Sequence, residues 1–442
     1  MRLHLLPVTC LLMLLPNVAN AQGRATDQHT SPAETSDAEL RYVVYLSRHG
    51  VRSPTGKAEQ YNRYSSAPWP IWSVQPGYLT PHGFHVMELF GAFDRSQLTA
   101  QGLLSANGCA DASRVTIYAD SDQRTRETGK AIAHGLMPGC DLTVHSLPEG
   151  TNDPLFHSGG HSLPGGSAGP DAALAMAAIA GRIGGDPANL TQAYYSQIAA
   201  LDHILATCGT APSSTQASTQ RVSLMEIPTT LSAGNGDHLA ELKGPLTAAS
   251  TLSENLLLEY TEGMDAANVG WGCVQSSGVK QFLALHSAAV EFSQRTPEIA
   301  RPQAHRLLNQ IRLALQQAAD QKALRGAIGN PSDRVLFLIG HDTNQENIAG
   351  LLNLTWIIDG RRDDTPPGGA ILFELWRNRS TRQYSVRIDY TAQTLDQMRE
   401  STPLTASTPP ERIPVFIPGC SRADMSCSLG SFLTILEKAV TQ

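Results

Sequence analysis

The chain has 442 residues, a length that suits two domains or one large domain with insertions. Apolar residues make up 41% and charged residues 17%, proportions that exclude an intrinsically disordered chain. The formal net charge of −7 argues against nucleic acid or an anionic membrane surface as a partner, although a locally basic pocket could still bind small anions.

The N-terminus has the features of a secretory signal peptide. Arg2 supplies a positive charge, residues 5–15 form a short apolar run, and residues 19–21 (Ala-Asn-Ala) have the spacing of a cleavage site. The apolar run is too short to span a bilayer. We therefore expect residues 1–21 to be removed, and the mature protein to be periplasmic or secreted, without membrane contact.

Six cysteines lie beyond the signal segment, and an even number in an exported protein indicates disulfide bonds. Cys420 and Cys427 would close a small C-terminal loop, and Cys109 and Cys140 bracket a predicted strand and helix. The remaining pair, Cys208 with Cys273, then follows by elimination. No Cys-x-x-Cys pair occurs, and we expect no metal site.

The stretch 48–55, Arg-His-Gly-Val-Arg-Ser-Pro-Thr, follows an apolar run at 42–46 that predicts a buried strand. Two arginines around one histidine are poorly suited to a core, because a buried cation needs a partner. Arginine binds phosphate through planar, bidentate hydrogen bonds, and an imidazole held against that phosphate is a candidate nucleophile. The residues concerned are Arg48, His49 and Arg52.

Two more buried strands, at 115–119 and 334–340, each end in a polar turn that opens a helix. Strand, turn and helix make half of a parallel α/β unit. Residues 371–376 and 384–390 alternate in polarity like an antiparallel pair at the edge of a sheet. Thr80 and Pro81 have the residue types of an N-cap and a first helical position.

The region 149–294 differs in character from the rest. It carries helical patterns at 172–183, 190–206 and 246–262, which predict a mainly helical inserted lobe. We assign 40–148 and 295–442 to an α/β catalytic core, which includes a long helix at 298–324 and a last helix from about residue 429.

The three buried strands end at Arg48, His49 and Arg52, at Arg124, and at His341 and Asp342. Ligands bind beyond the carboxyl ends of strands in open α/β sheets, so these side chains are expected to converge on one phosphate. Each has a structural alternative: the histidines as hydrogen-bonded structural residues, Arg124 as a surface residue paired with a nearby acid, and Asp342 as a helix cap. Their occurrence together favours a ligand site.

With these motifs the chain resembles the histidine acid phosphatases, and most of all their bacterial periplasmic phytase and acid phosphatase members. The resemblance covers almost the whole mature chain, including 48–55, 120–129, 270–272, 341–344, 365–369 and the C-terminal cysteine pair. It implies an α/β fold with a three-layer, phosphoglycerate-mutase-like core, built on a mixed, mainly parallel sheet. It also implies that His49 forms a phosphohistidine, that Arg48, Arg52, Arg124 and His341 bind the phosphoryl group, and that Asp342 protonates the leaving group.

The resemblance implies a small phosphate ester as substrate, with phytate among the candidates and no cofactor. We expect Asp342 to be protonated at the working pH, which would give an acidic optimum. Thr55 and Lys57 are candidate contacts to further phosphates, although Gly56 separates them, and Gln303 replaces an arginine of the phytase pocket. A glucose-1-phosphatase-like sugar phosphatase, a phosphoglycerate-mutase-like transferase and a non-catalytic phospholigand-binding module are the alternatives. We expect a monomer.

Overall fold

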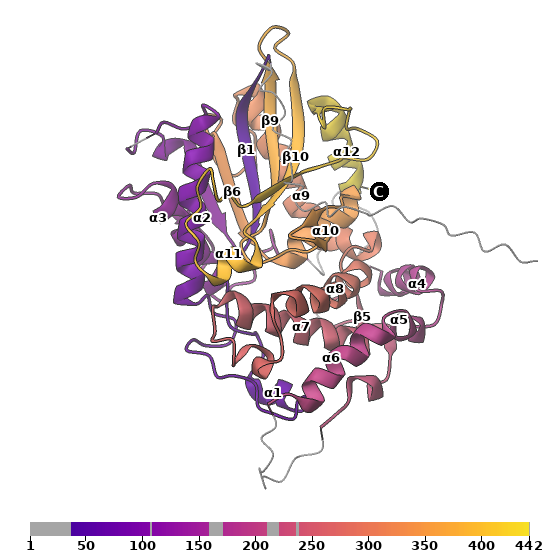
Figure 1. Cartoon of the computed structure of the whole chain (residues 1–442). Helices are drawn as coiled ribbons and strands as arrows, with labels where there is room; N and C mark the ends of the chain where they lie inside the picture. The colour runs from indigo at the N-terminus through magenta and orange to yellow at the C-terminus, as the bar shows by residue number, and fades with distance from the viewer. Residues whose placement is uncertain (1–36, 107, 159–170, 210–220, 236–237, 442) are drawn as a thin grey trace, which may run out of the picture. The chain divides into compact units, whose positions relative to one another are not determined.

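A mixed β-sheet of eight strands runs through the α/β part of the chain (Figure 1). The strand order is β11-β10-β9-β1-β6-β2-β3, and β12 pairs with β10. Four strands are parallel neighbours: β1 (Ala38–Arg48), β6 (Val335–Gly340), β2 (Val115–Ala119) and β3 (Val144–His145). Antiparallel pairing extends the sheet from β1 through β9 (Ala370–Asn378), β10 (Tyr384–Ala392), β11 (Glu411–Val415) and β12 (Cys427–Ser428).

The computed structural model describes residues 37–106, 108–158, 171–209, 221–235 and 238–441. The chain from Ala38 onward forms one compact unit, and the expected signal peptide, 1–21, lies outside the described residues. Within the described ranges, no helix is both long and apolar enough to cross a lipid bilayer. The predicted mixed α/β sheet is confirmed. Parallel pairing does not predominate as predicted: among the described strands of this sheet, three pairings are parallel and four are antiparallel, because β11 and β12 enlarge its antiparallel part.

Helices cover both faces of the sheet and make it the middle of three layers (Figure 1). On β1, Val43 and Tyr45 belong to the core on one face, whereas Val44 and Leu46 belong to the core on the other. Burial on both faces explains why this strand is a continuous apolar run. One outer layer contains α2 (Pro81–Ala100) and α3 (Gln123–Leu136), and the other contains α9 (Pro297–Asp320), α10 (Asp342–Leu352) and α12 (Leu429–Thr441).

Between β3 and α9 the described residues are mainly helical and have an apolar core of their own. That core also includes Val51, Trp69 and Leu395 from outside the region. The helix predicted at 190–206 is divided at Tyr194, and neither α8 nor the β4–β5 hairpin was predicted. The elements are α4 (Ala172–Arg182), α5 (Ala188–Ala193), α6 (Tyr195–Thr207), β4 (Thr230–Ala233), β5 (Ala240–Lys243), α7 (Pro245–Thr261) and α8 (Ser276–Ser293). That 149–294 is a separate inserted lobe stays a prediction.

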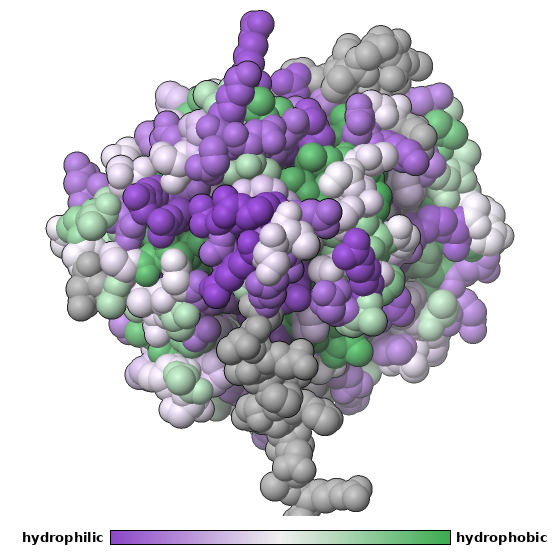
Figure 2. Space-filling model, turned by 90° about the horizontal axis from the view of Figure 1, so that it is seen from above, coloured by the Kyte–Doolittle hydropathy of each residue, from purple (hydrophilic) through white to green (hydrophobic). Residues whose placement is uncertain are grey.

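Short elements complete the fold: α1 (Ala58–Asn62), β7 (Ile357–Ile358), β8 (Arg361–Arg362) and α11 (Leu395–Arg399). Figure 2 views the molecule from the end at which β9 and β10 are joined, and hydrophilic residues predominate across the middle of that face. The large apolar side chains that are exposed are scattered along the chain: Ile71, Leu174, Tyr195, Val222, Ile357 and Phe416. Single exposed apolar residues of this kind are ordinary for a protein surface.

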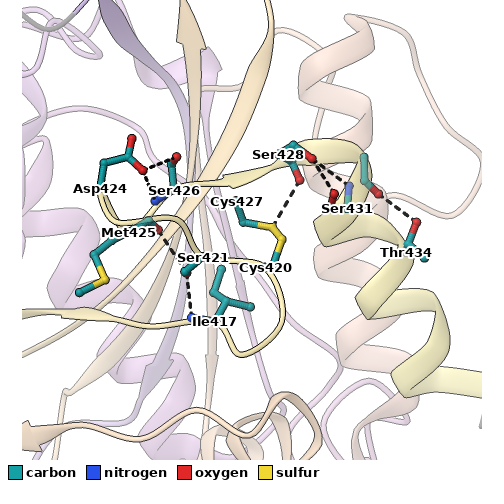
Figure 3. Close-up of a disulfide and its surroundings, with 11 residues drawn as sticks. Ile417, Cys420, Ser421, Asp424, Met425, Ser426, Cys427, Ser428, Ser431 and Thr434 are labelled. Carbon is teal, nitrogen blue, oxygen red and sulfur yellow. Dashed lines mark hydrogen bonds between the residues drawn. A yellow bond between two sulfur atoms is a disulfide. The ribbon is translucent and has the colours of Figure 1, made fainter.

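Three disulfides join the pairs expected from the sequence. Cys109 is bonded to Cys140, and Cys208 to Cys273, across Cα–Cα distances of 5.5 Å and 6.2 Å. Figure 3 shows the third, in which Cys420 is bonded to Cys427 beside the start of α12. This last bond ties the loop after β11 to β12, and so to the outer edge of the sheet.

Candidate active site

Three adjacent parallel strands bring the predicted polar clusters to one edge of the sheet. β6 lies between β1 and β2 and pairs in parallel with both. Beyond their carboxyl ends, His49, Arg52, Arg124, His341 and Asp342 line one cavity of about 570 Å³. Parts of the β5 hairpin strand, α7, α8 and α9 line the same cavity. Side chains that are far apart in the sequence thus face a common space large enough for a small ligand.

His49 has a fixed backbone and one occupied ring nitrogen. Its backbone N–H donates to the carbonyl of Gly340 at 3.0 Å, and its Nδ1 lies 2.9 Å from the carbonyl oxygen of Gly50. Because a carbonyl oxygen only accepts, Nδ1 carries the hydrogen and the lone pair remains on Nε2. Burial, followed by the charges of Arg124 and Arg52, holds the pKa of His49 well below its usual value. His49 is therefore a neutral imidazole with a nucleophilic Nε2.

Close to His49 in the sequence, Arg48 and Arg52 share the carboxylate of Glu254 on α7. Arg48 is 1% exposed; it donates to Glu254 and, at 2.5 Å, to the carbonyl oxygen of Thr365. The Nη2 of Arg52 lies 3.7 Å from the same oxygen of Glu254. Burial raises the pKa of Glu254, but the charges of Arg48, His286 and Arg52 together outweigh it and the pKa is lowered. An ionised Glu254 therefore offsets part of the positive charge in this site.

Arg124 and His341 lie against each other in the same cavity. Nη2 of Arg124, in the first turn of α3, is 2.6 Å from Asp122 and 3.3 Å from Nδ1 of His341. Nε2 of His341 donates to Oδ2 of the buried Asp120 at 2.6 Å. Since a guanidinium only donates, Nδ1 of His341 is the accepting nitrogen. The ring centroids of His341 and His49 are 5.6 Å apart, so both imidazoles can reach one small anion.

Asp342 begins α10 beside these groups. Its Oδ1 accepts the backbone N–H of Thr343 at 2.8 Å, and its Oδ2 lies 3.1 Å from Nη2 of Arg48. Burial raises the pKa of Asp342, but the charges of Arg48, His286 and Arg52 outweigh it and hold the pKa below its usual value. The surrounding side chains alone therefore keep Asp342 ionised, contrary to the expectation of a protonated carboxyl.

A family model described as the histidine phosphatase superfamily (branch 2) matches residues 39–177 and 189–391. The chain belongs to this superfamily. It is 36% identical to phytase AppA of Escherichia coli (strain K12), across 99% of this chain and 98% of that protein. It is 27% identical to a glucose-1-phosphatase of Providencia rettgeri, across 92% of this chain and 93% of that protein.

A solved structure of a phytase is also similar to this chain. Hafnia alvei phytase in complex with myo-inositol hexakis sulphate matches with a TM-score of 0.80 and 35% identity, covering 91% of this chain and 98% of that one. The family resemblance recognised from the stretch 48–55 is confirmed, and the protein is a phosphatase.

The two candidate contacts to further phosphates are placed differently in this histidine phosphatase. Thr55 lines the cavity of His49, and so does Gln303. Lys57 instead precedes α1 and lines a neighbouring cavity of about 300 Å³ with Trp69 and Trp72. Gly56, whose N–H donates to Tyr61 at 2.8 Å, turns the chain before the lysine. The structure therefore does not bring Lys57 together with the predicted site.

Neither Glu254 nor His286 was predicted from the sequence, and no role was predicted for Asp120. Glu254 is one of two buried acids of α7, and its partner Arg48 is 206 residues away. His286 of α8 is hydrogen-bonded to Ser250 at 3.0 Å. A buried acid inside an apolar helix is a signal that a cation lies opposite, but the sequence does not say which one.

Asp120, His157 and His341 form a group of potential metal ligands, whose ligand atoms lie within 4.8 Å of one another. Both histidines already lie within hydrogen-bonding distance of Asp120, and Arg124 places a positive charge against His341. A cation there would have to displace two hydrogen bonds beside a guanidinium. We therefore assign the group to hydrogen bonding.

Proposed function

We propose that this phosphatase hydrolyses small phosphate monoesters through a phosphohistidine formed on His49, with phytate among its substrates. The observation that carries the proposal is the free lone pair on Nε2 of His49, in a cavity that Arg52, Arg124 and His341 also line. A phosphoryl group in that space would have its oxygens near cationic and neutral donors while its phosphorus faces the nucleophile.

In the first step, Nε2 of His49 attacks phosphorus, and the bond from phosphorus to the ester oxygen breaks. The transition state spreads negative charge over three oxygens, which Arg52 and Arg124 stabilise from the cavity and Arg48, buried beside Asp342, stabilises through its charge. The departing alkoxide takes a proton from Asp342 and leaves as an alcohol. A bound phosphate dianion offsets the charge of Arg48, so it raises the pKa of Asp342 and allows this carboxyl to hold a proton.

In the second step, water attacks the phosphohistidine. The carboxylate of Asp342 accepts a proton from the water, the bond from phosphorus to nitrogen breaks, and inorganic phosphate is released with His49 neutral again. The proton that Asp342 lost in the first step is thereby returned. The arginines provide the neutralising charge throughout, and we propose that the reaction needs no metal or cofactor.

The identities of the relatives support phytate, and a sugar monophosphate as the alternative substrate. One relative is described as a phytase and another as a glucose-1-phosphatase. The position of Gln303 in the cavity, and of Lys57 outside it, favours substrates with few phosphates. A phospholigand-binding module without catalysis is disfavoured, because His49 and Asp342 are both present at the cavity.

We further propose that the enzyme acts in the periplasm or outside the cell, as a monomer. The three disulfides support an oxidising compartment.

The test is release of inorganic phosphate from p-nitrophenyl phosphate, glucose 1-phosphate and phytate near pH 5, for the wild type and for His49→Ala. We expect turnover of all three by the wild type, none above background by the variant, and no effect of a chelator on the wild type. Equal rates in wild type and variant would contradict the proposed nucleophile.

A further inference from the structure

Two histidines share a single carboxylate oxygen beside the phosphate-binding cavity. Oδ2 of Asp120 accepts from Nε2 of His341 at 2.6 Å and lies 2.8 Å from Nε2 of His157. The other oxygen, Oδ1, accepts the backbone N–H of Ser121 at 2.7 Å. Asp120 is 0% exposed, and hydrogen bonding to the two histidines lowers its pKa against the opposing effect of burial. The negative charge of Asp120 therefore acts on both imidazoles.

His157 lies outside the strands, but hydrogen bonds and packing tie its segment to β2 of the sheet. Its backbone N–H donates to the carbonyl of Asp153 at 2.9 Å, and the Asp153 carboxylate accepts from the hydroxyl of Tyr118 on β2 at 2.9 Å. The neighbouring Phe156 is 2% exposed and stacks on Tyr118. The side chain of His157 is 36% exposed and lines the same cavity as His49. Its ring is thus partly exposed in the cavity and tied to the strand that carries Tyr118.

The charges around this pair come from several elements. Asp120 and Asp122 follow β2, Arg124 lies in α3, and His341 follows β6; Asp153 lies on the same stretch as His157. The two imidazole centroids are 5.3 Å apart, so a charge on one acts directly on the other. From α9, the uncharged Gln303 contacts this segment: its backbone carbonyl accepts from the hydroxyl of Ser158, the residue after His157.

We propose that His157 is a positioning residue, which anchors Asp120 and thereby fixes the orientation and the proton of His341 for binding the phosphoryl group. The inference rests on the phosphatase mechanism proposed above. A second donor on Oδ2 keeps the carboxylate from turning away from His341. Burial lowers the pKa of His341, the hydrogen bond to Asp120 raises it, and the charge of Arg124 lowers it. A charge on His157, 5.3 Å away between ring centroids, lowers it further and so shifts the pH range over which His341 meets an anion as a cation.

The test uses inorganic phosphate as a competitive inhibitor, together with turnover of p-nitrophenyl phosphate, from pH 3 to pH 8. The variants are His157→Ala, which removes the donor, and His157→Asn, which keeps an N–H donor but carries no charge. His134→Asn is the matched control, because His134 is an exposed histidine of α3 that pairs with Glu88. Thermal unfolding is followed for all four proteins.

In His157→Ala we expect phosphate inhibition and kcat/KM to weaken about tenfold, the low end of the worth of a hydrogen bond to a charged group. His157→Asn should recover most of the loss. Because Asn removes a neighbouring positive charge, the pH above which phosphate inhibition fades should shift upward in this variant. His134→Asn should match the wild type.

If His157→Ala has the same phosphate inhibition, turnover and pH profile as the wild type, the inference is overturned. Equal losses in the Ala and Asn variants with an unshifted profile would overturn it too, because that result indicates a steric role alone. If His157→Ala does not fold, the profile of His157→Asn decides. A wild type that releases no phosphate from any ester would instead refute the proposed function, and phosphate protection of the folded protein would still test the inference.

Discussion

Replacing Glu254 with glutamine should lower the thermal stability of this enzyme and raise its affinity for phosphate. Glu254 contacts Arg48, which is 1% exposed, and faces Arg52 at 3.7 Å. The change keeps the shape of the side chain and removes its charge. Arg48 retains Asp342 at 3.1 Å, whereas Arg52 loses the carboxylate that faces it.

Breaking a buried ion pair by removing one partner costs about 3–5 kcal/mol. Because Arg48 keeps Asp342 as a partner, we expect a loss at the lower end of this range, about 3 kcal/mol. With an unfolding entropy of ~2.1 cal/mol/K per residue, the expected fall in Tm is about 3–4 °C for a domain of this length. The same uncompensated cations attract phosphate. Phosphate should therefore have a lower Kd for the variant than for the wild type. A ligand at 100 times its Kd stabilises a protein by about 2.7 kcal/mol, so at a given phosphate concentration the variant gains more stability than the wild type.

The assay is thermal unfolding of wild type and Glu254→Gln at pH 5, over a range of inorganic phosphate concentrations. We expect the gap in Tm between the two proteins to narrow as phosphate is added. Glu259→Gln is the matched control, because Glu259 is a buried acid of the same helix that accepts from the N–H of Gly270. A Glu254→Gln protein with the wild-type Tm, or one that gains no more from phosphate than the control, would refute this account of charge balance.

Four further predictions follow from the site and the core. Asp342→Asn should lower kcat by about 10²–10⁴ for an alkyl phosphate and far less for p-nitrophenyl phosphate, whose leaving group needs no proton; equal losses would contradict the proton-donor role. Arg124→Ala should lower kcat by about 10²–10³, the usual effect of removing one transition-state donor, and a loss confined to KM would contradict it. Burial raises the pKa of Glu259 to about 8, so the folded state binds a proton that the unfolded state releases above its ordinary value of 4.5. Stability should therefore fall as the pH rises from 4.5 to 8, and Glu259→Gln should flatten that fall in Tm; an unchanged slope would count against it. Replacing Cys208 and Cys273 together by serine should reduce the free energy of unfolding by about 2–5 kcal/mol in urea titrations, and wild-type stability would contradict a role for this bond.

The sequence predicted the parts of the fold that depend on local pattern. Strands buried on both faces, such as 42–46 and 334–340, appear as apolar runs, and the polar residues at their ends mark the catalytic edge. The helix predicted at 190–206 is broken at Tyr194, where no glycine or proline marks the break. The antiparallel pair of β4 and β5 was missed because its strands are only four residues each and have just one buried residue between them.

The site itself was predicted where the motif is contiguous, and missed where it depends on long-range contacts. His49 and Asp342 follow strands, so their meeting in one cavity could be anticipated. Glu254 could not, because nothing in α7 indicates that its carboxylate meets Arg48. Lys57 was expected near the substrate from its closeness to the motif, but the turn at Gly56 places it in the neighbouring cavity. The ionised state of Asp342 likewise depends on distances that only the fold supplies.

The most direct test of the central claim is to trap the phosphoryl-enzyme. The wild type would be mixed with an excess of p-nitrophenyl phosphate, quenched within milliseconds and digested at neutral to alkaline pH, and its peptides analysed by mass spectrometry. The account predicts the mass of one phosphoryl group on the peptide containing His49, and none in His49→Ala. Repeated trapping with steady turnover and no label on His49, or label on another residue, would contradict it.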